Sequence, residues 1–157
     1  MEICVLSIGK ITTGWIQQGI NLYESRINKY VKFTPIILSD VKNSKSLSKD
    51  SIKEEEGKAI LQQIQQSDYI VLMDEKGKEF TSREYSGWIQ KQMNSGRKRI
   101  VIVIGGPFGF SPEVYARADM NIALSKMTFT HEMAKLLLSE QIYRSFTILK
   151  GEPYHHD

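Results

Sequence analysis

Three residues near the end of the chain have side chains that can do chemistry. Arg144 can stabilise a negative charge on a ligand, Tyr154 can stack on a planar group, and His155 can exchange a proton. Glu140 precedes Arg144 by four residues, a spacing that pairs the two side chains on one face of a helix. A short polar chain end is also typical of an unstructured terminus. The spacing therefore leaves open whether the tail belongs to a site.

Two loops further back have the composition of a ligand-binding edge. The β-branched run 100–104 ends at Gly105 and opens into GGPFG, whose glycines let the backbone approach a ligand closely. The run 120–124 ends in the polar turn 125–128. Ligands of parallel α/β proteins bind at the carboxyl ends of strands. The two loops therefore predict a two-sided pocket.

The common nucleotide and metal motifs are missing. The glycine spacing does not fit the dinucleotide fingerprint G-x-G-x-x-G, and no Walker A sequence occurs. Gly9 and Asp40 follow the first two strands as in Rossmann-type methyltransferases, but an aspartate after a strand is common turn chemistry. His131 is expected to cap or pack the last helix, and without a cysteine pair or a His-x-x-x-His spacing we predict no metal site.

Composition predicts one globular domain over residues 1–157. Hydrophobic residues make up 41% and charged residues 25%, and the net charge of +3 is only a mild preference for anionic partners. No segment has the length of a membrane span, and the first residues form a strand rather than a signal peptide. The single Cys4 permits no internal disulfide, which fits a cytoplasmic location.

Hydrophobic periodicity predicts five strands that alternate with five helices, and hence a mainly parallel sheet with helices on both faces. Capping boxes are expected at Ser51 with Glu54 and at Thr81 with Glu84, and 74–78 is expected to be a turn. The last helix is apolar on more than one face, so it is buried on two sides, within the domain or against a second subunit. The strands are predicted at 2–8, 33–38, 68–73, 100–104 and 120–124, and the helices at 15–30, 51–65, 81–94, 112–117 and 131–150.

Three motifs together identify a family. IGGPFGFSPEV (104–114), LSKMTFTHEMAKLLLSEQIYRSF (124–146) and PYHH (153–156) resemble the RlmH family of SPOUT-class methyltransferases, and the similarity covers the whole chain. The resemblance implies an α/β-knot fold with a C-terminal trefoil knot, a homodimer, and S-adenosyl-L-methionine bound in the knot loops. It also implies N3-methylation of a pseudouridine in 23S rRNA of the large subunit, on assembled ribosomes.

The resemblance also assigns residues. For the reaction that it implies, we expect Arg144 to stabilise an anionic base, His155 to accept a proton or orient the base, and Tyr154 to stack on an extruded base. His156 stands where the family usually has a basic residue, and Lys135 stands where arginine is frequent. The cofactor residues mapped by motif are Met73, Gly105, Leu124, Ser125, Lys126, Met127, Thr128 and Phe129.

Three alternatives stay open. A SPOUT methyltransferase acting on tRNA is disfavoured by the absence of an appended RNA-binding domain. A non-catalytic ribosome-associated factor would bind the cofactor without transferring a methyl group. A nicotinamide-dependent enzyme is the third. Several cations could contact phosphates: the lysines of the loop from Lys42 to Lys53, Arg117, Lys126 and Lys135. Solvated surface charge is a sufficient explanation for any single one of them.

Overall fold

A computed structural model describes residues 1–156. Its five-stranded sheet has the order β2-β1-β4-β3-β5, and every neighbouring pair is parallel. The prediction of a parallel α/β sheet flanked by helices is therefore confirmed. The strands are β1 (Glu2–Ile8), β2 (Lys32–Leu38), β3 (Tyr69–Glu79), β4 (Arg99–Ile104) and β5 (Met120–Ala123). The helices are α1 (Gly14–Ile27), α2 (Lys49–Gln63), α3 (Ser82–Asn94), α4 (Pro112–Arg117) and α5 (His131–Lys150), with a 3₁₀ turn η1 (Ser44–Ser46).

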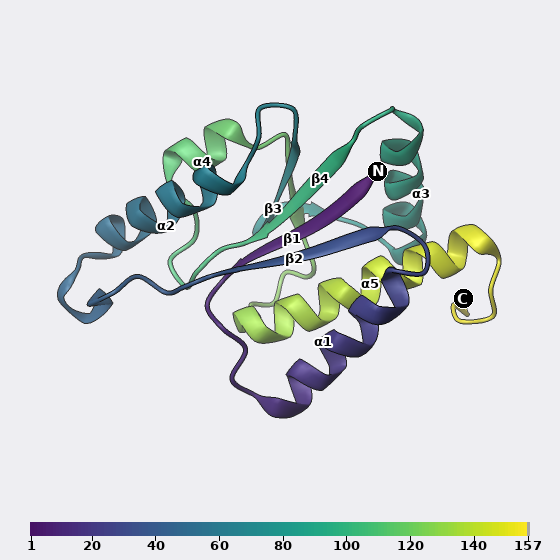
Figure 1. Ribbon diagram of the computed structural model, residues 1–157, viewed down its shortest axis with the longest axis horizontal. Coiled ribbons are helices and arrows are strands. Elements are labelled where there is room, and N and C mark those ends of the chain that lie inside the picture. The colour runs from purple at the N-terminus through teal and green to yellow at the C-terminus, as the bar shows by residue number, and fades with distance from the viewer. Residues whose placement is uncertain (157) are drawn as a thin grey trace.

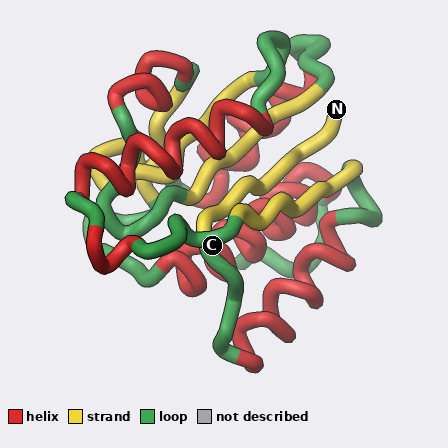
Figure 2. Tube along the Cα trace, turned by 60° about the vertical axis from the view of Figure 1, so that its left-hand side comes forward, coloured by secondary structure: helices red, strands yellow, loops and turns green. Residues whose placement is uncertain are grey.

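Helices cover both faces of the sheet, giving three layers (Figures 1 and 2). On one face, α1, α3 and α5 pack on residues such as Ile3, Val5 and Ile102. On the other face, α2 and α4 pack on Cys4 and Val101. Strands covered on both faces must be apolar throughout, and β1 and β4 are buried along almost their full length. Among the described residues, no helix is long and apolar enough to cross a membrane.

The segment 74–79 differs from the predicted turn. It continues β3, and after an irregular stretch Lys78 and Glu79 pair with β5. Gly77 lies so close to β5 that a Cβ atom there would be 2.6 Å from the backbone of Asn121 and Ile122. The polar composition of this segment suggested a turn, but strand pairing with β5 holds it extended.

The caps agree with the sequence at three helices and differ at one. Thr81 and Glu84 form the expected capping box. Ser111 and Thr130 cap α4 and α5 as predicted. The capping box expected at Ser51 is wrong, because α2 begins earlier and Ser48 is its N-cap, accepting a hydrogen bond from the Ser51 amide.

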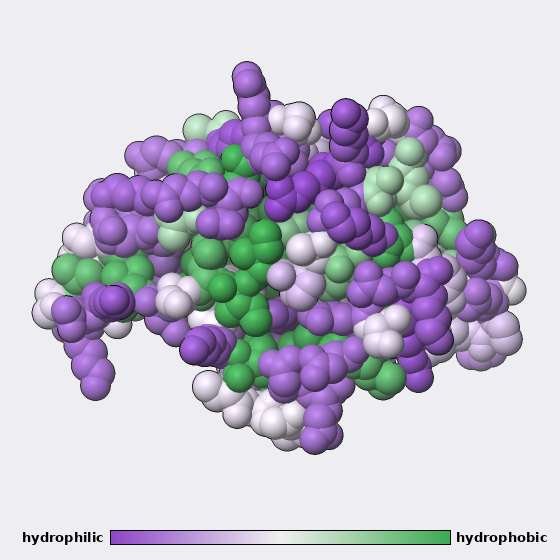
Figure 3. All heavy atoms as spheres, in the orientation of Figure 1, coloured by the Kyte–Doolittle hydropathy of each residue, from purple (hydrophilic) through white to green (hydrophobic). Residues whose placement is uncertain are grey.

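The two-sided burial of α5 arises within the domain. The helix packs against α1 on one side and α3 on the other, over the sheet. Its excess apolar surface therefore does not require a second subunit. Apolar side chains are nevertheless exposed elsewhere: Trp15 and Leu22 on α1 are 62% and 48% exposed. Figure 3 shows further hydrophobic atoms along the β2 edge, between the hydrophilic surfaces of α2 and α1, where Ile37 is 45% exposed.

Candidate functional site

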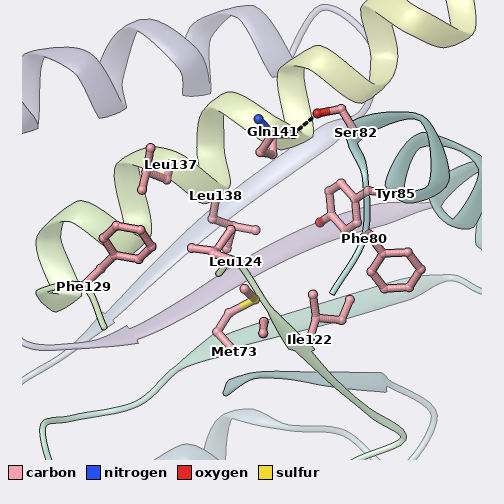
Figure 4. Close-up of a pocket in the computed structure, with 11 residues that line it drawn as sticks. Met73, Phe80, Ser82, Tyr85, Ile122, Leu124, Phe129, Leu137, Leu138 and Gln141 are labelled. Carbon is pink, nitrogen blue, oxygen red and sulfur yellow. Dashed lines mark hydrogen bonds between the residues drawn. The ribbon is translucent and has the colours of Figure 1, made fainter. Parts of the chain in front are cut away.

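A pocket of about 240 Å³ lies between the carboxyl ends of β3 and β5, the start of α3 and the middle of α5. Met73 ends the regular part of β3, Leu124 follows β5, and Phe129 precedes α5, so strand ends form one wall. The remaining wall comes from α3, α5 and the segment before α3, and is mostly apolar (Figure 4). Its residues are Phe80, Ser82, Tyr85, Leu137, Leu138 and Gln141, with Ile122 and Ala123 of β5 beneath them.

The structure brings together three of the eight residues assigned to the cofactor, namely Met73, Leu124 and Phe129. The turn 125–128 lies outside this wall and is largely exposed, with Met127 75% exposed. Its side chains reach the irregular part of β3, where Thr128 donates to Glu75 at 3.1 Å and Lys126 lies 4.0 Å from Glu79. Ser125 accepts a hydrogen bond from the Met127 amide, which folds the turn.

Gly105 follows β4 and is not part of the pocket lining. A Cβ atom there would lie 2.8 Å from the ring of Phe110, so a larger residue would force that ring to shift. At Gly106 a Cβ atom would lie 2.4 Å from the carboxylate of Glu56, which is buried beneath the loop. Burial raises the pKa of Glu56, although a hydrogen bond from the Gly106 amide opposes this shift. The GGPFG loop is thus held by close packing on both of its first glycines.

The second group of predicted residues forms a cluster at the far end of α5. Glu140 accepts hydrogen bonds from Arg144, at 3.0 Å from Nε and 2.6 Å from Nη2, and from the Tyr154 hydroxyl at 3.1 Å. The remaining nitrogen Nη1 lies 3.2 Å from Nδ1 of His155, and the guanidinium lies 4.8 Å from the centre of the Tyr154 ring. The structure therefore joins Arg144, Tyr154 and His155, with Glu140 as their common partner.

Contacts with α1 and α5 hold the tail over this cluster. The Tyr154 ring meets Tyr143 edge-on at 4.8 Å, and its hydroxyl lies 3.5 Å from that of Tyr23. Before it, Glu152 accepts a hydrogen bond of 2.6 Å from Tyr30. Burial, with the neighbouring tyrosine and Glu140, raises the pKa of Tyr154, so its hydroxyl remains protonated. The tail is therefore ordered and packed onto the Arg144 cluster.

The contact with Arg144 also determines the tautomer of neutral His155. A guanidinium has only donors, so Nδ1 must accept and the ring proton lies on Nε2. In this geometry the neutral His155 ring can donate a hydrogen bond from Nε2.

Hydrogen bonds connect the pocket wall with the cluster. Ser82 donates to Gln141 at 2.8 Å, and Gln141 donates to the second oxygen of Glu140 at 2.8 Å. Sequence analysis assigned no role to Ser82, Gln141 or Tyr85. One signal was available: the Thr81 capping box starts α3 just after β3, which places Ser82 and Tyr85 near the edge where ligands bind.

The other predicted residues are spread over the molecule. His131 is exposed at the first turn of α5, near Gly9 and Asp40. Arg117 caps carbonyls of the loop before β3, including that of Asp68 at 2.9 Å, which gives it a structural role. Lys135 is 2% exposed, so it does not reach a phosphate. Among residues 1–156, no group of His, Cys, Asp or Glu is arranged to hold a metal ion.

Comparison with known proteins agrees with the geometry. The family model described as "Predicted SPOUT methyltransferase" matches residues 1–155. A protein of Christiangramia forsetii named ribosomal RNA large subunit methyltransferase H is 51% identical over 156 residues, covering 99% of both chains. Proteins of the same name from Parabacteroides distasonis and Flavobacterium psychrophilum are each 49% identical, covering at least 99% of both chains. The chain therefore belongs to the RlmH family of SPOUT methyltransferases.

Proposed function

We propose that this protein transfers a methyl group from S-adenosyl-L-methionine to N3 of a pseudouridine in 23S rRNA of the large ribosomal subunit. The observation that carries the proposal is the cluster of Arg144, Tyr154 and His155, which combines a cation, an aromatic face and an imidazole in one hydrogen-bonded group. Relatives with about half of the residues identical, named large-subunit rRNA methyltransferases, support the substrate.

The pocket has a mostly apolar lining of the kind that the cofactor's purine ring needs. Its walls are apolar, which suits a purine ring, and Met73, Leu124 and Phe129 would hold it. The turn 125–128 supplies backbone groups beside it and would cover the ligand. When bound, the cofactor supplies a methyl group on a sulfonium, which reacts with a nucleophile aligned within about 3 to 3.5 Å.

The protein's own groups act on the base. The N3 nitrogen of a uracil-type ring must lose its proton before or during attack, which leaves negative charge on the ring. Arg144 is placed to stabilise that charge, and its pairing with Glu140 fixes its direction. With its proton on Nε2, His155 would orient the base by donating a hydrogen bond. Tyr154 offers a stacking face for a base removed from its helix.

We further propose a homodimer with a trefoil knot. The exposed Trp15 and Leu22 lie seven residues apart on α1 and so share one face, which is suited to a second subunit. The close approach of Gly77 to β5, with the contacts of the turn 125–128 to β3, is where the two knot loops would meet. The ribosomal substrate implies a cytoplasmic protein. Because the net charge is only +3, the substrate is expected to be an assembled ribosome that is recognised by its shape.

Methyl transfer tests the proposal. Labelled S-adenosyl-L-methionine is incubated with ribosomes, separated subunits, naked rRNA and tRNA from cells that lack the gene. Label is expected in 23S rRNA of ribosomes, and it should be lost in Arg144→Ala and His155→Ala. Lys150→Ala, an exposed cation on the same helix, is the matched control and should retain activity.

The alternatives predict different results. Label in tRNA would favour a SPOUT tRNA methyltransferase. Cofactor binding without label in any RNA would favour a non-catalytic ribosome-associated factor, and binding of NAD in place of S-adenosyl-L-methionine would favour a nicotinamide-dependent enzyme.

A further inference from the structure

One tyrosine hydroxyl in the pocket wall has no hydrogen-bond partner. Tyr85 is 6% exposed, and its hydroxyl is closed off from solvent without a bond to any residue that the structure describes. The hydroxyls of Tyr30, Tyr115 and Tyr154, in contrast, all contact carboxylates. An unpaired buried hydroxyl destabilises a protein, so its presence at a pocket suggests a ligand contact.

The direction of this hydroxyl is fixed by packing. The ring of Tyr85 stacks on Trp88 at 5.5 Å with 15° between the planes, and it meets Phe80 at 6.2 Å. The residue lies in the first turn of α3, which the Thr81 capping box fixes. Figure 4 shows the hydroxyl directed toward Leu124 on the opposite wall. It therefore cannot turn to the surface without disrupting the aromatic stack.

The other polar side chains of the wall are already paired. Ser82 donates to Gln141, and Gln141 donates to Glu140. The remaining lining side chains are apolar. Burial raises the pKa of Tyr85, so the hydroxyl keeps its proton and can both donate and accept. Tyr85 thus supplies the unused polar side-chain group of this wall.

We propose that the Tyr85 hydroxyl hydrogen-bonds to the adenosine part of the cofactor, a contact that rests on the proposed function. Adenine offers ring nitrogens as acceptors and an amino group as donor, and the ribose offers hydroxyls. The pocket of about 240 Å³ is smaller than the roughly 300 to 1,000 Å³ of typical ligand sites. A nucleoside must therefore widen it, and separating Tyr85 from Leu124 uncovers the hydroxyl.

The test is Tyr85→Phe in the full-length protein, with affinity measured by calorimetry for S-adenosylhomocysteine and for adenosine. Loss of one hydrogen bond should weaken both ligands by about threefold to tenfold. The melting temperature without ligand should stay equal or rise, because the variant no longer buries an unpaired hydroxyl. The matched control is Tyr69→Phe, at the opposite end of β3, where affinity should not change.

The outcomes separate this contact from other roles. Equal affinity of Tyr85→Phe and wild type would overturn the proposal. Weaker binding together with a lower melting temperature would assign Tyr85 a structural role and also overturn it. Loss of affinity for S-adenosylhomocysteine but not for adenosine would exclude the adenosine contact. Failure of the wild type itself to bind S-adenosylhomocysteine would refute the proposed function instead.

Discussion

Replacing Gly106 with alanine tests how the GGPFG loop is held. The new Cβ atom would lie 2.4 and 2.5 Å from the two carboxylate oxygens of Glu56. Ordinary contact requires about 3.5 Å, so one of the two groups must move by about 1 Å. Glu56 is 5% exposed and has little room to move. Gly106 is therefore restricted by a neighbouring side chain that sequence inspection does not reveal.

Gly106→Ala should lose folding stability for two reasons: overpacking against Glu56, and loss of the hydrogen bond between the Gly106 amide and Glu56. Overpacking costs about 1 to 3 kcal/mol, and losing the hydrogen bond about 1 kcal/mol more, so we expect destabilisation of about 2 to 4 kcal/mol. For a chain of this length that corresponds to a fall in Tm of about 4 to 16 °C. Because Gly105 is adjacent, cofactor affinity should fall as well.

The assay is a double-mutant cycle by urea denaturation, with wild type, Gly106→Ala, Glu56→Ala and the double variant. Removing the Glu56 side chain should abolish most of the penalty of Gly106→Ala, giving a coupling energy of about 2 kcal/mol. The matched control is Gly87→Ala in α3, where a Cβ atom meets nothing within 4 Å and should stabilise by about 0.4 to 1 kcal/mol. A penalty that is the same with and without Glu56 would refute the steric explanation.

Three further predictions follow from single contacts. Gly77→Ala should destabilise by about 3 kcal/mol or more in urea unfolding, because its Cβ would meet the backbone of Ile122, which cannot rotate away; wild-type stability would refute the close approach. Glu140→Gln should lower kcat for methyl transfer by about tenfold or more without changing cofactor affinity, since it releases Arg144; an equal loss of affinity would contradict a role confined to the cluster. Hydrogen bonds to Glu132, chiefly the one donated by the Thr12 amide, lower its pKa to about 2. Between about pH 4.5 and 2 the folded state therefore binds fewer protons than the unfolded state. The contribution of ionised Glu132 to stability is complete above about pH 4.5 and is lost as pH falls toward 2. Glu132→Gln should therefore be less stable than wild type at pH 7 and equally stable at low pH. A difference that stays constant across this range would refute the lowered pKa of Glu132.

The sequence by itself determined most of the secondary structure and part of the site's chemistry. Apolar β-branched runs of strand length define β1 and β4, since such runs are stable only when covered on both faces. The Thr81 and Thr130 caps are local, satisfying backbone amides within three residues, so sequence reveals them. The pairing of Glu140 with Arg144 is local for the same reason.

Tertiary structure decided what depends on partners far apart in the chain. The polar segment 74–79 is extended because it pairs with β5, about 45 residues later. The two serines Ser48 and Ser51 both fit the N-cap of α2, and the first serves only because the helix begins earlier than its local pattern suggested. The tail joins the Arg144 cluster because Tyr30, just after α1, donates a hydrogen bond to Glu152, and Glu140 accepts hydrogen bonds from Arg144 and Tyr154.

The pocket was decided in the same way. Tyr85 looks like an ordinary core residue in sequence, and its unpaired hydroxyl appears only when α3 packs beside Leu124 and α5. Sequence alone likewise predicts Gly106 to be only a turn residue, and the structure shows that the Glu56 carboxylate leaves no room for a side chain there. Local spacing specifies helices, strands and caps because their hydrogen bonds are short-range. Cavities and shared acceptors form only when elements distant in sequence pack together.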